Sequence, residues 1–336
     1  MKNVQIYTPA KALLFGEYGV LLGGKAIVVT FFDFYFHVSL TLKQQVALNS
    51  IIVKSKFFEN EILQFSLTSS TSLNTIKDNK NLFFFFQLLQ PWQEHLNNYQ
   101  LEIEILHSYS PALGFGSSSA IIASVSKGLW QLFYNNTEKF LESSLFWEKV
   151  RQSLLNIQTS GSCYDVAVQL AASHNNRTKQ PTKLWLFQNQ KNSCIPKIEP
   201  FSINIPIKNL GCFIATQIYS ETTHALKIFS QDAKKLDYAT KHSAIANKFQ
   251  DCKNLQEVAA LLDNSLALSK EQNIIPKNNN QLNLIIYALN EKKISYKTMG
   301  AGHGDCFWVL ASKETLIKKC FVDANCIPFS FESIEI

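Results

Sequence analysis

PALGFGSSSA, residues 111–120, is the segment that says most about the architecture of this chain. It follows Leu101 to His107, where apolar and acidic residues alternate as in a half-buried strand. It precedes Ala120 to Phe133, an apolar run with the length of a helix. Gly114 and Gly116 permit positive φ and a close approach of the backbone to a ligand. Because the first N–H groups of a helix lack partners within it and its dipole favours negative charge, such a turn can bind phosphate.

The three serines after Gly116 add hydroxyl groups at the same point. Serine hydroxyls can bond phosphate oxygens or a hard cation such as Mg²⁺, and serine is also a common helix cap. Two familiar phosphate-binding patterns are excluded, because no lysine follows Gly116 and Ser119 stands where a third glycine is needed. Glycine-rich turns with a serine cap also occur without any ligand, so these residues alone leave both interpretations open.

The composition is typical of a globular protein with room for two domains. The chain has 336 residues, of which 46% are hydrophobic and 17% charged, so a large core is expected and disorder is not. The net charge is +6, but no Lys/Arg run exceeds two residues, which argues against nucleic-acid binding. The seven cysteines contain no C-x-x-C pair, which favours reduced thiols over a zinc site or a disulfide framework.

No part of the sequence predicts membrane insertion or secretion. Met1 to Tyr7 lacks the apolar region of a signal peptide. The longest apolar stretch, Ala26 to Phe36, is shorter than the roughly 20 residues that a membrane helix needs. We therefore expect a soluble, cytoplasmic protein.

Strand and helix patterns are mixed without strict alternation, which favours an α+β fold. Turn signals and apolar runs predict strands at residues 4–7, 12–15, 20–22, 26–41, 101–107, 184–187, 210–216, 295–299 and 306–310, with two more within 49–67. Periodicity predicts helices at 81–95 (with a break at Pro91), 120–133, 141–155, 165–172, 222–235, 238–250, 254–273 and 279–292. We place a domain boundary near residue 200.

Three segments, in the same order, resemble the motifs of the GHMP kinase superfamily. PAKALLFGEYGVL at residues 9–21 resembles its first motif, residues 111–120 resemble the second, and KTMGAGHGDC at residues 297–306 resembles the third. The resemblance covers nearly the whole chain. It implies a two-domain α+β GHMP kinase fold, with an ATP-binding, ribosomal-protein-S5-domain-2-like domain at 1–200 and a ferredoxin-like domain at 201–336.

The resemblance also implies roles for individual residues. Asp165, in SGSCYDVA at residues 160–167, is similar to the aspartate that faces the reacting hydroxyl, and Lys11 is the implied catalytic cation beside it. Taken alone, Asp165 could be an N-cap and Lys11 a strand lysine that reaches solvent. The implied ATP and phosphate ligands are Gly114, Gly116, Ser117, Ser118, Ser119, Gly300 and Gly302, the implied substrate contacts are Glu17, Tyr18, Ser162 and Thr223, and the implied metal ligand is Ser118.

The implied activity is phosphoryl transfer from ATP, with Mg²⁺, to a small-molecule acceptor of the mevalonate pathway. Nucleic-acid and membrane partners are not expected, and the chain is expected to be a monomer or a homodimer. The motif residues of phosphomevalonate kinases are similar to those found here at Glu17-Tyr18, Asp305-Cys306 and Asp165-Val166-Ala167. Mevalonate kinase stays the alternative, followed by a sugar kinase and a non-catalytic ligand sensor.

Two substituted glycines and one missing acidic residue depart from the family pattern. Ala10 and His303 replace glycines of the first and third motifs, so unstrained or reshaped backbone is expected there. No acidic residue nearer than Glu148 precedes Asp165, although mevalonate kinases hold Mg²⁺ with such a residue. Metal binding is therefore expected to rest on Ser118, the nucleotide phosphates and water.

Overall fold

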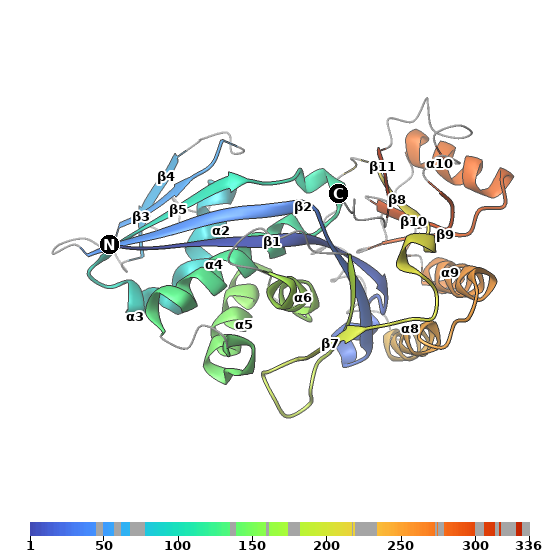
Figure 1. Ribbon diagram of the computed structural model, residues 1–336, viewed down its shortest axis with the longest axis horizontal. Helices are drawn as coiled ribbons and strands as arrows, with labels where there is room; N and C mark the ends of the chain where they lie inside the picture. The colour runs from blue at the N-terminus through green and yellow to red at the C-terminus, as the bar shows by residue number, and fades with distance from the viewer. Residues whose placement is uncertain are drawn as a thin grey trace.

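The computed structural model describes residues 1–44, 50–56, 62–67, 78–134, 139–158, 161–173, 182–216, 218, 234–272, 274, 279–299, 306–312 and 316, and the backbone of 327–330. Within these residues the chain forms a seven-stranded sheet and a four-stranded sheet, each packed with helices (Figure 1). The predicted α+β class is confirmed.

The larger sheet is built on one long antiparallel pair. Its strands are β1 (Lys2–Phe15), β2 (Lys25–Gln44), β3 (Ser50–Lys54), β4 (Ile62–Ser66), β5 (Tyr99–His107), β6 (Lys183–Gln188) and β7 (Lys197–Phe201). The order is β4-β3-β5-β2-β6-β7, with β1 paired to β2 and only the β3–β5 pair parallel. The β1–β2 register shifts between Pro9 and Ala10, where the partner changes from Tyr35 to Phe31.

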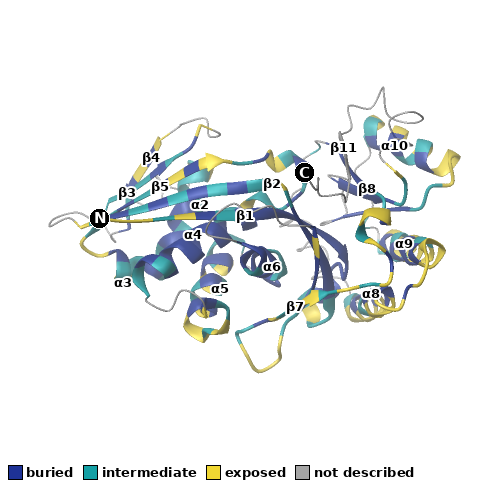
Figure 2. Cartoon of the chain, viewed as in Figure 1, coloured by how far each residue is buried: buried dark blue, intermediate teal, exposed yellow. Residues whose placement is uncertain are grey.

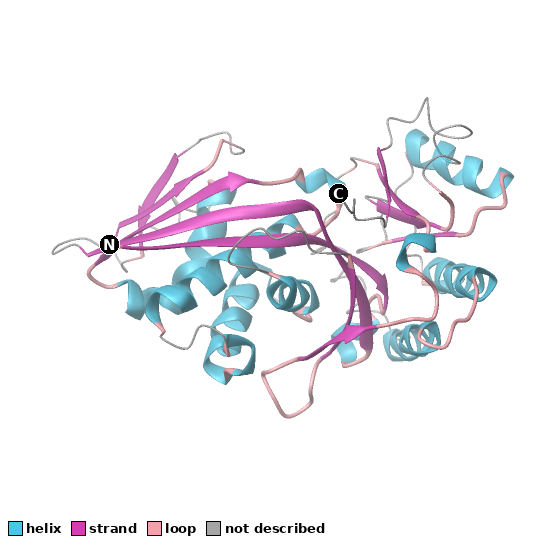
Figure 3. Ribbon diagram, viewed as in Figure 1, coloured by secondary structure: helices cyan, strands magenta, loops and turns pink. Residues whose placement is uncertain are grey.

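Helices from the first half of the chain gather on one face of this sheet (Figure 3). They are α2 (Lys80–Leu89), η2 (Gln90–Trp92), α3 (Gln93–Leu96), η3 (Pro111–Leu113), α4 (Ser117–Phe133), η4 (Phe140–Glu142), α5 (Ser144–Gln158) and α6 (Tyr164–Ala172). Both α4 and α6 pack on β1 and β2 and on each other. The two helices that carry the predicted site thus share one interface with the strand that carries Lys11.

The smaller sheet belongs to the second half of the chain. Its strands run in the order β11-β8-β10-β9 and are β8 (Cys212–Ala215), β9 (Tyr296–Thr298), β10 (Cys306–Val309) and β11 (Ile327–Ser330). The helices here are α8 (Lys235–Phe249), α9 (Leu255–Glu271) and α10 (Asn280–Glu291), and η5 (Ile207–Asn209) precedes β8. Sheet membership changes between β7 and β8, while one buried cluster includes Phe31, Phe213 and Trp308 from both sheets. The division into domains at residue 200 stays a prediction.

Two sequence-based expectations about local structure are wrong. Residues 20–22 form not a strand but the 3₁₀ turn η1 (Gly19–Leu22), because the chain has positive φ at Gly16, Tyr18 and Gly23. The start of α4 has no serine cap: the N-cap is Gly116, with φ of 75° and no side-chain bond to the helix. The strands β7 and β11 were not predicted. The predicted helix at 222–235 lies almost entirely outside the described residues.

The described helices differ from membrane-spanning helices. None of them combines the length and the apolar character that crossing a bilayer demands.

Candidate active site

The segment between β5 and α4 turns sharply at two glycines. Gly114 has φ of 74° and Gly116 has φ of 75°, both in the left-handed region that glycine adopts without strain. Phe115, between them, is buried with its ring 5.0 Å from Phe31 and 5.8 Å from Phe213, so the turn is anchored to both sheets. The Ser119 hydroxyl donates to the Gly116 carbonyl at 2.9 Å. Gly114, Gly116, Ser117, Ser118 and Ser119 therefore lie together at the N-terminus of α4.

This turn packs directly on Lys11 of β1. The Lys11 N–H donates to the Phe115 carbonyl at 3.1 Å. A Cβ placed on Gly116 would lie 2.4 Å from Lys11 Cε, so the lysine side chain runs along the glycine backbone. A side chain at position 116 would displace Lys11, and glycine is required there for space as well as for φ.

Lys11 is only 6% exposed and lies in the buried half of β1 (Figure 2). It therefore does not extend into solvent as a strand-edge lysine would. Its Nζ donates to the Tyr164 hydroxyl at 3.3 Å and lies 5.0 Å from the centre of the Tyr164 ring. Because Tyr164 is the first residue of α6, Lys11 reaches from the turn at Gly116 to the start of the helix that carries Asp165.

Asp165 is the second residue of α6, and it is partly exposed. The N-cap is Cys163, with φ of 67° and no capping side-chain bond, so Asp165 is not the helix cap that its sequence position also allowed. Its Oδ1 accepts from the Val166 N–H at 2.9 Å. Burial raises the pKa of the Cys163 thiol to about 12, and the nearby Asp165 charge adds to this, so the thiol is not an alternative nucleophile at neutral pH.

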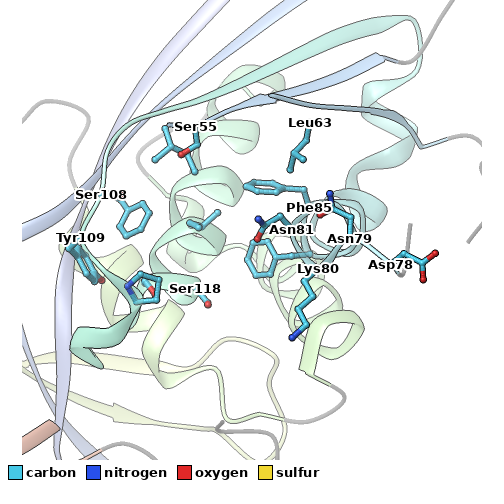
Figure 4. A pocket seen from close by; sticks show the side chains of 16 residues that line it. Ser55, Leu63, Asp78, Asn79, Lys80, Asn81, Phe85, Ser108, Tyr109 and Ser118 are labelled. Carbon is cyan, nitrogen blue, oxygen red and sulfur yellow. The ribbon is translucent and has the colours of Figure 1, made fainter. Parts of the chain in front are cut away.

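A cavity of about 830 Å³ opens beside Ser117 and Ser118, at the N-terminus of α4. Figure 4 shows Ser108, Tyr109 and Ser118 on one side of it and Asn79, Lys80 and Asn81 on the other. The second group is the start of α2, where the Asn79 side chain accepts from the Leu82 N–H at 3.0 Å. The remaining wall is largely apolar, with Phe36, Leu63, Phe84, Phe85, Ile105 and Ile121.

Two helix N-termini, those of α2 and α4, thus border one cavity. Each end presents backbone N–H groups and the positive pole of a helix dipole. The apolar wall between them suits a flat, weakly polar group. The cavity can hold a ligand that joins an aromatic ring to a chain of phosphates.

Glu17 and Tyr18 are both buried, at 4% and 7% exposure. The Glu17 carboxylate is ion-paired with Lys297 of β9, and Lys297 Nζ also donates to the Leu14 carbonyl at 2.7 Å. Tyr18 has φ of 54° and packs edge-on against Tyr238 at 6.1 Å. These contacts connect the first segment to the second half of the chain, and the substrate role implied for Glu17 and Tyr18 stays a prediction.

The other predicted ligands divide into one described residue and three that are not. Ser162 is buried, and its carbonyl accepts from Asn189 Nδ2 at 3.0 Å. Gly300, Gly302 and Thr223 lie outside the described residues, as do His303 and Asp305 of the third motif. Their roles stay predictions.

In the described part of the chain, no group of three His, Cys, Asp or Glu side chains could hold an ion. Mg²⁺ that is bound together with a nucleotide usually keeps several waters and takes one or two protein ligands plus substrate phosphates. Ser118, at the cavity wall, fits a single-ligand contribution of that kind.

Two sets of residues at this site were not predicted from the sequence. Tyr164 had no role assigned, although it stands beside Asp165 and contacts Lys11. The start of α2 was predicted only as part of a helix, without a role at the site. Asn79, which precedes an apolar run, is the N-cap signal that predicts a helix terminus beside the cavity.

No protein-family model matches the sequence, and no curated protein matches it either. Solved structures do. Mevalonate kinase of Methanococcus jannaschii aligns over 98% of this chain and 98% of its own, with a TM-score of 0.64 and 19% identity. Phosphomevalonate kinase of Streptococcus pneumoniae also aligns over 98% of both chains, with a TM-score of 0.64 and 16% identity. Lactococcus lactis galactokinase, solved with galactose, aligns over 94% of this chain and 87% of its own, with a TM-score of 0.65 and 14% identity.

The chain has the GHMP kinase fold. At these identities the likeness establishes the fold and leaves the acceptor open. Within that fold, the first and second motif segments and the start of α6 lie against one another through Lys11.

Proposed function

We propose that the chain is an ATP-dependent small-molecule kinase. The observation that carries this proposal is the position of Lys11, whose side chain runs along Gly116 and ends at Tyr164, next to Asp165. A buried cation thereby contacts a helix N-terminus, and it ends at the first residue of the helix that carries the Asp165 carboxylate. Phosphoryl transfer needs these groups, because positioning and charge neutralisation account for most of its catalysis.

The cavity bordered by α2 and α4 is the proposed ATP site. The phosphates would lie on the turn from Gly114 to Ser119, where N–H groups and hydroxyls are available. The base would lie against the apolar wall near Phe84 and Phe85. Mg²⁺, bound with the nucleotide, would neutralise phosphate charge, and Ser118 is its proposed protein ligand.

Asp165 and Lys11 have complementary proposed roles. The Asp165 carboxylate would orient the acceptor hydroxyl or accept its proton. Lys11, held between Gly116 and Tyr164, would stabilise the negative charge that develops between the acceptor oxygen and the transferred phosphoryl group. Neither step requires a covalent intermediate with the protein.

For the acceptor we propose phosphomevalonate, with mevalonate as the alternative. The support is the wording of the motifs, together with the fold that the chain shares with kinases of both names. An acceptor phosphate needs cations on its side of the site. Arg151 is not a candidate, because its guanidinium donates to the Cys194 carbonyl and to Asn189 Oδ1, both at 2.8 Å. The second arginine, Arg177, lies outside the described residues, and we propose a lysine for that phosphate.

The acceptor is tested by comparing kcat/KM for phosphomevalonate and mevalonate at fixed ATP and moderate salt. We expect phosphomevalonate to be preferred. A tenfold preference for mevalonate, about 1.4 kcal/mol in transition-state binding, would overturn the proposed acceptor while leaving the kinase proposal intact. If neither supports ATP consumption, galactose and other sugars are the next acceptors to assay, since galactokinase shares the fold.

A further inference from the structure

Gln169 is a completely buried polar residue on α6, one turn beyond Asp165. Residues four apart lie on the same face of a helix, so Gln169 and Asp165 face the same side. Burying an amide is costly unless its hydrogen bonds are made. Two hydrogen bonds of its Nε2 satisfy the donor half of this amide.

One bond of Gln169 reaches the strand of Lys11. Its Nε2 donates to the Pro9 carbonyl at 2.9 Å. Pro9 lies where the β1–β2 register shifts, so that residues 32–34 have no partner in β1. Irregularities of this kind bend a strand and redirect its side chains. The Gln169 amide thus holds β1 at its bend, two residues before Lys11.

The other bond reaches the turn from Gly114 to Ser119, the proposed phosphate site, which we call the phosphate turn. The same Nε2 donates to the Gly116 carbonyl at 3.2 Å. Gly116 is the N-cap of α4, and its carbonyl also accepts from Ser119 Oγ at 2.9 Å and from the Ala120 N–H at 3.0 Å. One amide group therefore joins β1, the turn before α4, and α6. β1 belongs to the large sheet, and α4 and α6 pack on it and on each other (Figure 1).

We infer that Gln169 is a positioning residue for phosphoryl transfer: its amide fixes the strand of Lys11 and the phosphate turn relative to the helix of Asp165. This inference rests on the proposed kinase function. Gln169 acts through the other groups and does not touch the reactants. Displacement of a catalytic group by about 1 Å can lower the rate about 10²-fold. Loss of the Gln169 bonds, which join all three elements, should therefore lower kcat more than it weakens ligand binding.

The kinetic test uses Gln169→Met, which keeps the length of the side chain and removes both N–H donors. We expect kcat to fall about 10- to 100-fold, with KM for ATP and for the acceptor changed less than about threefold. The matched control is Lys127→Met, which removes bonds between α4 and the far end of α6, where Lys127 Nζ donates to the Ser173 carbonyl at 3.0 Å and to its hydroxyl at 3.1 Å. We expect the control to retain kcat within about twofold. Equal losses in the two variants would overturn the inference.

Hydrogen exchange of the intact protein supplies a readout that does not depend on activity. In Gln169→Met, amides of residues 8–12 and 114–119 should both exchange faster than in the wild type, whereas Lys127→Met should leave both segments protected. Wild-type protection of both segments in Gln169→Met would overturn the inference even if the protein transfers no phosphate. If the Met variant does not fold, Gln169→Asn keeps the amide but is too short for both bonds, and the same two outcomes apply to it.

Discussion

Asp165 is the proposed orienting group or base for the acceptor hydroxyl, and its replacement should affect catalysis without unfolding the helix. It lies in the first turn of α6, and no described element depends on it as a cap. Asp165→Asn keeps the size and removes the charge and basicity. We expect kcat to fall by about 10²–10⁴, with the KM for ATP little changed. A variant that keeps more than about a tenth of the wild-type kcat in steady-state assays would contradict the assigned role.

His242, buried on α8, makes stability depend on pH. Burial lowers its pKa to about 4 from an ordinary value of 6.5. Glu17 Oε2 lies 3.4 Å from its Nδ1, but this carboxylate is already paired with Lys297, so burial dominates. Between pH 6.5 and 4 the unfolded chain binds a proton that the folded chain does not. The free energy of unfolding should therefore fall by up to about 3 kcal/mol as pH drops through this window.

Urea unfolding of the wild type and of His242→Gln at pH 7 and at pH 4.5 measures this effect. Carboxylates elsewhere affect both proteins equally, so the difference between them isolates His242. The wild type should lose more stability on acidification than the variant. An equal loss in both proteins would show that His242 does not bind its proton differently in the folded and unfolded chains.

Single residues show where sequence reasoning is sufficient and where it is not. The motifs predicted Lys11, Gly116 and Asp165. Lys11 packs on Gly116 and contacts Tyr164, the residue before Asp165, and the catalytic roles of these residues stay predictions. Gln169 could not be identified, because a glutamine in a helical segment carries no signal of the two carbonyls it will meet across 160 and 53 residues of sequence.

At the scale of the element, the start of α4 is the feature on which ATP use depends. Ser118 lines the cavity next to the Gly116 N-cap, whereas Ser119 is occupied by its bond to the Gly116 carbonyl. Ser118→Ala should raise the KM for Mg²⁺·ATP about tenfold, the scale of one lost bond to a charged ligand, without changing thermal stability. The control is Ser193→Ala, on an exposed loop, which should change neither. Unchanged ATP kinetics in Ser118→Ala would remove the phosphates from this turn.

Element boundaries followed the sequence pattern except where backbone conformation or long-range pairing decided them. The paired strands around residues 49–67 and the helix broken at Pro91 were predicted and are confirmed. The turn η1 was mistaken for a strand, because its apolar residues do not reveal the positive φ of Tyr18. Strand β7 escaped prediction because it is mostly exposed, and it forms by pairing with β6.

At the scale of the molecule, the two sheets are joined through a buried ion pair. Lys297 of β9 meets Glu17 and the Leu14 carbonyl of β1, and it lies against the Phe15 ring at 5.5 Å. Removing one partner leaves the other charge buried. Lys297→Met should therefore lower the free energy of unfolding by about 3–5 kcal/mol, whereas the double variant Glu17→Leu/Lys297→Met should lie close to the wild type.

Urea unfolding of Glu17→Leu, Lys297→Met and the double variant completes this cycle. Recovery of stability in the double variant is the expected result. If the double variant is as unstable as Lys297→Met, the loss comes from packing and not from an uncompensated charge.

Transfer of the γ-phosphate of labelled ATP is the most direct test of the proposed activity. Wild-type protein, Mg²⁺ and labelled ATP are incubated separately with phosphomevalonate, mevalonate and galactose, with Asp165→Asn as the parallel control. We predict that the label appears on phosphomevalonate with the wild type and falls by about 10²-fold or more in the variant. Wild-type protein that binds ATP but labels none of these acceptors, or equal labelling by wild type and variant, would contradict the account.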